Sequence, residues 1–290
     1  MNGIGPATMC MICGGATASD RHEWLFRCRD CGFLSSNLQP SINSIDVTIA
    51  EDKRGDALQS LRRQNFEVIL DWLGIVGVEP SARVLDVGCG HGWFVMAAIT
   101  RGYEAIGVEP DNAIAAVAEA NGARVRQGSF PEMVKPGETF DVIVFNDVFE
   151  HLLDPPGAIA DTWRCLKPSG VLVINLPLQT GTFYRLAHAL DRVGVHGPLR
   201  RMWQLGFPSP HRSYFSADQL SQFVARHGFR ESARHTLPSV TVKGLWERLR
   251  YDPNQSAIAA VVMWPVLAFL APFLRFLPAD IGVQIFRRTN

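Results

Sequence analysis

Cysteine spacing gives the first indication of chemistry in this chain of 290 residues. Four of its six cysteines form two CxxC pairs, Cys10 with Cys13 and Cys28 with Cys31, with fourteen residues between the pairs. Two such turns bring four thiolates together, a donor set that matches the tetrahedral preference of Zn²⁺. Because four thiolates leave no open coordination site, we predict a structural Zn²⁺ rather than a reaction centre. Redox-active CxxC pairs and thiols without metal are the alternatives.

The cysteine-rich segment, residues 1–35, is too short to bury a core of its own, so metal binding would supply much of its folding free energy. His22 lies between the two pairs and is surplus to a four-cysteine site, so we expect it on the surface. Cys89 and Cys165 have no partner in the pattern and are expected to be small buried apolar residues. Residues 1–15 show no secretory signal, and we therefore expect a reducing, cytoplasmic setting.

A second pattern, DVGCGHGW at residues 86–93, places three glycines where a strand would turn into a helix. Such a turn lets the backbone approach a ligand and directs N–H groups toward it. A dinucleotide fingerprint needs a small residue at position 93, where Trp93 stands, and the sequence here lacks the lysine of a P-loop. Glu109 ends the next apolar run and can accept hydrogen bonds from both hydroxyls of a ribose. Asp86 suits an ammonium or sulfonium cation.

The elements that would position these residues follow from the alternation of apolar runs with helix-like stretches. Runs rich in Val and Ile predict strands at 83–87, 104–108, 123–127, 140–145 and 171–175. Helices are predicted between them at 92–101, 111–121 and 155–167, and this rhythm is typical of an α/β fold with a parallel sheet covered by helices on both faces.

The regions on either side of this alternation are less regular. Apolar residues at helical spacing predict a helix over 58–73, preceded by a linker at 36–57. A helix is expected at 216–227, and later strands at 229–236 and 281–287.

Four of these segments, in order, resemble the motifs of class I S-adenosylmethionine-dependent methyltransferases. VLDVGCGHG (84–92) is similar to the first motif, IGVEP (106–110) to the second, and FDVIVFNDVFEHLLDP (140–155) with LKPSGVLVINLP (166–177) to the fourth and fifth. The resemblance covers about residues 60–236. It implies a methyltransferase domain over 58–290 whose seven-stranded Rossmann-like sheet has the order 3-2-1-4-5-7-6, with an antiparallel seventh strand.

The resemblance implies S-adenosylmethionine as the cofactor, with the glycines along its methionine moiety and Glu109 on its ribose. The family often places an Asp after the third strand to contact the adenine amine. Ser129 stands here instead, so adenine selection would depend more on the backbone and on Phe130. The cofactor-binding residues implied in this way are Asp86, Gly88, Cys89, Gly90, Gly92, Glu109, Pro110, Ser129, Phe130, Asn146 and Asp147.

Transfer to an oxygen requires that the nucleophile lose a proton, and the catalytic candidates are His151, His211 and Asp147. His211 precedes a segment similar to the family element that borders the substrate pocket. The segment around His151 resembles the O-methyltransferases of ubiquinone biosynthesis, in which the matching residues can hold a divalent cation. One interpretation is therefore Mg²⁺ at Asp147, Glu150 and His151. The other, which we favour, is that Glu150 and His151 orient the turn without metal.

Residues 177–215 are predicted to form a substrate lid after the fifth strand. Aromatic and arginine side chains mix in this segment, which suits an aromatic, lipid-linked or sugar substrate with an anionic group. The alternative is an amphipathic lid with its arginines in water.

Residues 245–278 form a second predicted insertion. Within it, 256–274 contains nineteen residues without a charge, interrupted by two prolines and flanked by Trp246, Arg248, Arg250 and Arg275. We predict peripheral contact with the inner face of the membrane through 256–274, and a buried helix pair is the alternative.

Charge distinguishes among partners. The chain has 28 basic and 28 acidic residues, and this balance argues against nucleic acid as a partner. Residues 1–184 carry a net charge of −8 and residues 185–290 a net charge of +8, so an anionic partner should meet the C-terminal third.

We predict methyl transfer to a hydroxyl of a small, lipid-linked or glycan-linked acceptor. An RNA methyltransferase with a zinc ribbon and a non-catalytic scaffold that binds S-adenosylmethionine are the alternatives. Sugar C-methyltransferases share the cysteine-rich N-terminus but usually carry a further C-terminal domain.

Overall fold

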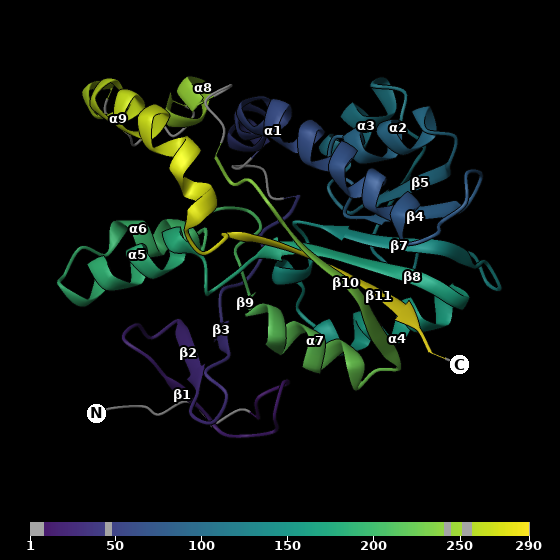
Figure 1. Ribbon diagram of the computed structural model, residues 1–290, viewed down its shortest axis with the longest axis horizontal. Helices are drawn as coiled ribbons and strands as arrows, with labels where there is room; N and C mark the ends of the chain where they lie inside the picture. The colour runs from purple at the N-terminus through teal and green to yellow at the C-terminus, as the bar shows by residue number, and fades with distance from the viewer. Residues whose placement is uncertain (1–8, 44–47, 241–244, 251–256, 290) are drawn as a thin grey trace.

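A seven-stranded sheet forms the centre of the molecule (Figure 1). The computed structural model describes residues 9–43, 48–240, 245–250 and 257–289. The strand order is β10-β11-β8-β7-β4-β5-β6, and β11 runs antiparallel to both of its neighbours. This arrangement confirms the predicted order and the antiparallel seventh strand. The strands are β4 (Arg83–Val87), β5 (Glu104–Glu109), β6 (Val125–Gln127), β7 (Phe140–Asn146), β8 (Leu166–Pro177), β10 (Phe229–Leu237) and β11 (Ile281–Arg288).

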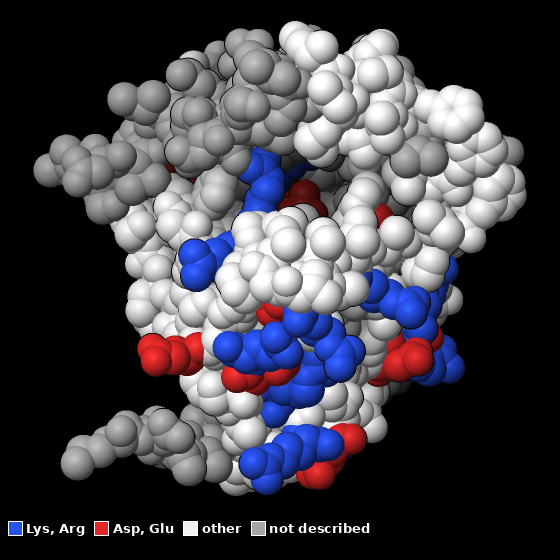
Figure 2. All heavy atoms as spheres, turned by 90° about the vertical axis from the view of Figure 1, so that its left-hand side faces the viewer, with Lys and Arg blue, Asp and Glu red and all other residues white. Residues whose placement is uncertain are grey.

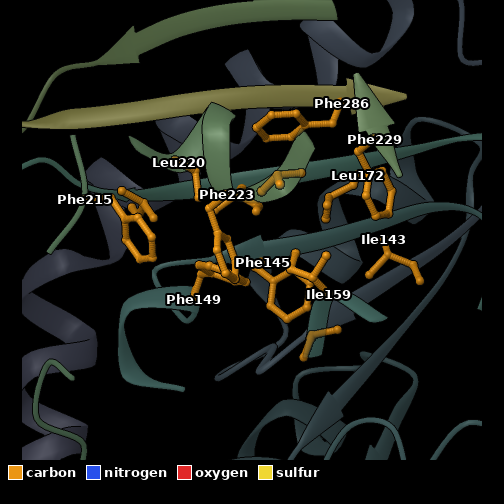
Figure 3. Close-up of a cluster of buried hydrophobic side chains, with 14 of the residues drawn as sticks. Ile143, Phe145, Phe149, Ile159, Leu172, Phe215, Leu220, Phe223, Phe229 and Phe286 are labelled. Atoms are coloured by element: carbon orange, nitrogen blue, oxygen red, sulfur yellow. The ribbon is translucent and has the colours of Figure 1, made fainter. Parts of the chain in front are cut away.

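Helices cover both faces of this sheet. Helices α1 (Thr48–Ile75), α2 (Trp93–Thr100) and α3 (Asn112–Ala120) lie on one face, and α4 (Pro155–Cys165) and α7 (Ala217–Ala225) lie on the other. Both faces of β7 are buried. Val142 and Val144 belong to a first core, under α1, α2 and α3, and Ile143 and Phe145 belong to a second core, under α4 and α7. Figure 3 shows the second core, where Phe223 of α7 and Ile159 of α4 reach the sheet.

Helix α1 begins at Thr48, ten residues earlier than the predicted helix. The stretch expected to be a linker, residues 36–57, is therefore partly helical, and its residues 44–47 lie outside the described part of the chain. The difference has a physical reason. Residues 48–57 are rich in Ala, Glu, Asp, Lys and Arg, which extend an existing helix without an apolar stripe.

The cysteine-rich segment forms a small second sheet of order β1-β2-β3-β9. Strands β1 (Thr17–Ser19), β2 (Leu25–Cys28) and β3 (Leu34–Ser36) come from this segment, but β9 (Ser213–Tyr214) comes from the predicted lid. The lid also contributes α5 (Thr182–Arg192) and α6 (Gly197–Met202), which pack with Leu25 and Leu34 around the fully buried Trp203. The cysteine-rich segment and the lid thus share one sheet and one core.

Asp191 of α5 links this segment to the lid by polar contacts as well. Its Oδ1 lies 2.8 Å from His22 Nε2 and 2.7 Å from His196 Nδ1, and its Oδ2 lies 3.3 Å from Arg21 Nε. The expectation that His22 is a surface residue is wrong, because its side chain is only 13% exposed. His196, which has no signal in the sequence, belongs to the same cluster.

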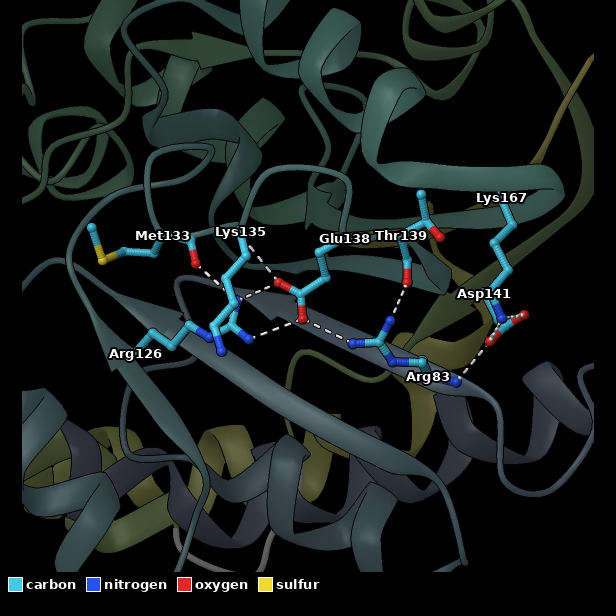
Figure 4. Close-up of polar contacts among 8 residues, drawn as sticks. All are labelled: Arg83, Arg126, Met133, Lys135, Glu138, Thr139, Asp141 and Lys167. Atoms are coloured by element: carbon cyan, nitrogen blue, oxygen red, sulfur yellow. Dashed lines mark hydrogen bonds and ion pairs between the residues drawn. The ribbon is translucent and has the colours of Figure 1, made fainter.

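Ion pairs tie the strands together at the edge of the sheet where β4 and β7 begin (Figure 4). Glu138 accepts hydrogen bonds from Arg126 of β6 and, at 2.8 Å, from Arg83 of β4. These contacts lower the pKa of Glu138 to about 2, with the Arg126 hydrogen bond as the main cause. Lys167 of β8 pairs with Asp141 of β7 at 2.8 Å.

The apolar insertion contains α8 (Leu245–Arg250), α9 (Ala257–Leu270) and the 3₁₀ helix η2 (Ala271–Phe276). Among the described residues, none of the helices combines the length and the apolar character needed to cross a bilayer.

Candidate active site

The glycine-rich turn connects β4 to α2 at the carboxyl edge of the sheet. Gly90 adopts a φ of +53°, and a Cβ added there would meet nothing within 4 Å, so the backbone faces open space. Its N–H donates to Glu109 Oε2 at 2.9 Å, while the Asp111 N–H donates to Oε1 at 2.9 Å. The turn and the end of β5 are therefore joined through both oxygens of one buried carboxylate.

Asp86, at the end of β4, is 2% exposed and accepts a hydrogen bond from Asn146 Nδ2 at 3.2 Å. Burial raises the pKa of Asp86 to about 8, and the nearby charge of Glu109 adds to the effect. Two carboxyl groups at one end of a cavity favour a cationic ligand, which would stabilise the ionised form of Asp86. An ammonium or sulfonium group meets this requirement.

A cavity of about 1030 Å³ opens over this turn. Ten of the eleven predicted cofactor-binding residues line it, from Asp86 at the turn to Asp147 after β7. Gly92 does not line it. A Cβ at Gly92 would lie 2.4 Å from the Cβ of Ala123, so a glycine here allows α2 to begin close to the segment that contains Ala123. Cys89 contributes mainly backbone, because its side chain packs against Gly107 of β5.

Part of the cavity wall comes from residues that the sequence did not identify as binding residues. Residues 40–43, within the predicted linker, line it, and Asn43 holds them in place. Asn43 Nδ2 donates to the Pro110 carbonyl at 3.0 Å, and its Oδ1 accepts from Asn112 N at 3.0 Å. Asn43 follows Pro40 in a segment without periodicity, so its sequence carried no signal for this role.

A second pocket of about 290 Å³ adjoins the first and shares Arg62, Asp147 and His151 with it. Its walls come from α1, from β8 and from the lid, and it includes Phe183, Tyr184, Arg201, Phe207 and His211. The two predicted catalytic histidines thus lie in one pocket beside the cofactor cavity.

Glu150, His151 and His211 form the polar cluster in this pocket. Glu150 Oε1 lies 3.8 Å from His151 Nε2 and 4.0 Å from His211 Nε2, and the two imidazole rings are 4.7 Å apart in an edge-on arrangement. The cluster is built by short segments, since η1 (Phe149–His151) carries two members and the Arg212 N–H donates to the Glu150 carbonyl at 2.7 Å. Gln204 Nε2 lies 2.8 Å from His211 Nε2 and orients that ring.

Asp147 stands apart from this cluster. Its Oδ2 lies 3.5 Å from Arg62 Nε, and its backbone has a φ of +53°. Among the described residues, the ligand atoms that lie close together at this place belong to Glu150, His151 and His211, and not to the set Asp147, Glu150 and His151 of the alternative with Mg²⁺. Two imidazoles and one carboxylate do not match the oxygen ligands that Mg²⁺ prefers, and Arg62 already supplies Asp147 with positive charge.

The four cysteines of the N-terminal segment do converge. Cys10 Sγ lies 3.6 Å from Cys31 Sγ and Cys13 Sγ lies 3.4 Å from Cys28 Sγ, and all four sulfurs are within 4.8 Å of one another. Four thiolates at Zn–S distances of about 2.3 Å would be separated by roughly 3.8 Å, so the set fits Zn²⁺. The backbone N–H groups of Ile12 and Gly15 donate to the sulfurs of Cys10 and Cys13 at 3.4 Å, and such hydrogen bonds hold metal-binding thiolates in place.

Comparison with known proteins agrees with this site. Residues 58–231 match a family described as a methyltransferase domain, and the chain belongs to that family. The order of the sheet, the glycine turn and the carboxylate on β5 place it among the class I S-adenosylmethionine-dependent methyltransferases.

Individual relatives are similar over only part of the chain. A ubiquinone biosynthesis O-methyltransferase of Azorhizobium caulinodans is 31% identical over 111 residues, which cover 36% of this chain and 44% of the relative. A tRNA U34 carboxymethyltransferase of Methylococcus capsulatus is 30% identical over 176 residues, 56% of this chain and 50% of the relative. The chain therefore spans about half the length, or less, of these relatives.

A solved structure shows the same fold at low identity. The magnesium protoporphyrin IX methyltransferase of Synechocystis PCC 6803, with bound S-adenosylhomocysteine, has a TM-score of 0.55 at 12% identity, covering 83% of this chain and 95% of that one.

Proposed function

We propose that this protein transfers a methyl group from S-adenosylmethionine to a hydroxyl of a small, lipid-linked or glycan-linked acceptor. The observation that carries the proposal is the shared wall of the two pockets. Arg62, Asp147 and His151 line both, so a ligand in the larger cavity and an acceptor in the smaller one would meet at these residues.

The cofactor, when bound, supplies an electrophilic methyl group. The acceptor oxygen would form a bond to the methyl carbon as the carbon–sulfur bond breaks, and the electron pair of the broken bond would stay on sulfur. The hydroxyl proton passes to the His151–His211 pair, and Glu150, within 4.0 Å of both, stabilises the resulting imidazolium. Holding the groups in line supplies much of the remaining rate enhancement.

The residues of the second pocket support an acceptor that is partly apolar and partly anionic. Phe183, Tyr184 and Phe207 offer aromatic surface, while Arg201 offers a cation that suits a phosphate or carboxylate. A volume of about 290 Å³ is at the lower limit for a small-molecule site, so it suits the reacting end of a larger molecule.

The donor set of Glu150, His151 and His211 supports proton transfer without Mg²⁺. At the four cysteines we infer a structural Zn²⁺. Burial raises the pKa of Cys10 and Cys31. Burial also acts to raise the pKa of Cys28, but hydrogen bonds from the backbone and from neighbouring thiols together outweigh it and lower that pKa to about 7. A divalent cation would stabilise the four thiolates together.

Nucleic acid is a weaker candidate as the acceptor, although one relative is named for tRNA. Two of the arginines in the cysteine-rich segment face carboxylates, Arg27 with Asp20 at 3.0 Å and Arg21 with Asp191 at 3.3 Å. Phosphate contacts would have to compete with these pairs.

Methyl-deuterated S-adenosylmethionine, offered with a panel of phenolic, glycosyl and phospholipid alcohols and separately with RNA, followed by mass spectrometry, tests the proposal. We expect a labelled methyl ether from at least one acceptor, and a loss of about a hundredfold or more in kcat for His211→Asn. His227→Asn is the matched control, because His227 contacts the Phe223 carbonyl and lines neither pocket. Binding of the cofactor without any transfer would favour the scaffold alternative, and label on RNA would favour the nucleic-acid one.

A further inference from the structure

The apolar insertion begins and ends at the wall of the second pocket. Ser239 and Val240 precede it, Asp280 and Ile281 follow it, and all four line that pocket. Ser239 Oγ donates to Asp280 Oδ2 at 3.0 Å, and this hydrogen bond joins the two ends of the insertion. We call these two ends, residues 239–240 and 280–281, the neck of the insertion. Asp280 Oδ1 accepts from the Phe183 N–H at 2.7 Å, so the neck is fixed to the start of α5.

Outside this neck, the insertion exposes apolar side chains to an unusual degree. A small cluster of α8 and α9, with Leu245, Leu249 and Leu267, holds the helices together. Phe269 is 72% exposed and Phe276 is 71% exposed. The other exposed apolar side chains of the segment are Val261, Val262, Met263, Trp264, Val266, Phe273 and Leu277. This exposure contradicts the alternative prediction that residues 256–274 form a buried helix pair.

The sequence of α9 contains no charged residue, so none of its faces is suited to contact with bulk water. A helix of fourteen residues is too short to span the apolar core of a bilayer, but it suits insertion into one leaflet. Exposed Trp246 and Trp264 are the aromatic residues that prefer the membrane interface.

The lid adds positive charge on the same side of the molecule. Figure 2 shows an uncharged surface above a hollow on this side of the molecule, with basic side chains gathered below the hollow. On α5 and α6, Arg185, Arg192 and Arg200 are exposed, next to the exposed apolar Leu186 and to Val193 beyond α5. A protein partner would need a groove for the apolar segment and acidic residues for the arginines, whereas an anionic lipid leaflet supplies both chemistries at once.

We propose that α9, η2 and the exposed side of α5–α6 form a docking surface for an anionic membrane leaflet. The neck then places the second pocket at the lipid surface, so that a lipid-linked acceptor reaches it without leaving the membrane. That last point rests on the proposed function, whereas the docking itself does not. Under this proposal we expect the contact at the cytoplasmic face, because that leaflet carries a negative surface potential.

Flotation of the full chain with vesicles tests the proposal. The vesicles contain phosphatidylcholine alone or phosphatidylcholine and phosphatidylglycerol in equal parts. We expect co-flotation with the anionic vesicles that weakens with salt. Phe269→Asp combined with Phe276→Asp should weaken binding by about a hundredfold. Neutralising Arg185, Arg192 and Arg200 with Gln should weaken it by about fivefold for each arginine.

The control is Ile75→Asp, which places one aspartate, against two in the test variant, at an apolar position that is 77% exposed at the end of α1. It should float like the wild type, and all variants should bind S-adenosylhomocysteine normally if they are folded. The proposal is refuted if the wild type does not float with anionic vesicles, or if the double aspartate variant floats equally well. A wild-type dimer that the double variant dissociates, without vesicle binding by either, would show that a second copy covers the surface. Vesicle binding without any methyl transfer would refute only the proposed function.

Discussion

Replacing Glu109 by Gln should weaken cofactor binding while leaving the fold intact. The carboxylate accepts one backbone N–H on each oxygen, from Gly90 and from Asp111, and also lines the cofactor cavity. An amide has only one oxygen, so the substitution turns one accepting position into a donor that faces either a backbone N–H or a ribose hydroxyl. A lost hydrogen bond to a charged group is worth about 1.5–3 kcal/mol, and we therefore expect binding weaker by roughly 10-fold to 150-fold.

Calorimetry with S-adenosylhomocysteine measures this effect without turnover. Glu67→Gln is the matched control, because the same chemical change occurs on an exposed ion pair with Arg101, outside the cavity. The control should bind like the wild type. Unchanged affinity of the Glu109→Gln protein, or tight binding of a nicotinamide dinucleotide by the wild type, would refute our assignment of the cavity.

Three further predictions concern the parts around the site. Cys13→Ser should remove bound Zn²⁺, measured by mass spectrometry of the metal, and lower the melting temperature by several degrees while retaining cofactor affinity; a full metal complement would contradict the thiolate site. Asp191→Asn should cost about 2–4 kcal/mol in the free energy of unfolding, because the buried carboxylate bonds two histidines, and an unchanged denaturation midpoint would show that this contact is dispensable. The pKa of Glu138 is about 2 in the folded protein, below its ordinary 4.5. Its ion pairs therefore stabilise the fold by about 3 kcal/mol above pH 4.5, and this stabilisation is lost as the pH falls through 2. Glu138→Gln should be less stable than the wild type at neutral pH, and the difference in the free energy of unfolding should shrink in acid.

The sheet was predictable because its signals are local. Its central strands, such as β4, β7 and β8, contain short runs rich in Val, Ile, Leu and Phe that end at a turn, and the order of such runs fixes parallel βαβ units. The glycine turn was equally readable, since a positive φ at Gly88 and Gly90 is a requirement that the residue type itself reports. Gly92 was not predictable in the same way. It serves close packing against Ala123 and not a ligand, and the spacing of the glycines does not distinguish these two roles.

The contacts that the sequence did not predict join residues far apart in the chain. His22 and Asp191 are separated by 169 positions, and β9 has only two residues, too few for any periodicity. Arg62 lies on α1, a helix that the apolar pattern of the sequence predicts. The pairing of Arg62 with Asp147, however, depends on how α1 crosses the sheet. Such contacts arise from tertiary packing and have no local pattern to report them.

The lid and the apolar insertion meet at the second pocket, and strand β3 bonds to the lid beside it. Ser36 Oγ, at the end of β3, donates to the His211 carbonyl at 2.7 Å, and Asp280, at the neck of the insertion, accepts a hydrogen bond from the Phe183 N–H of the lid. The cofactor cavity, by contrast, is built mainly from the strand ends of the sheet and the backbone around Gly90. Changes in the three added parts should therefore alter which acceptor binds and how fast it reacts, whereas cofactor affinity should follow the sheet.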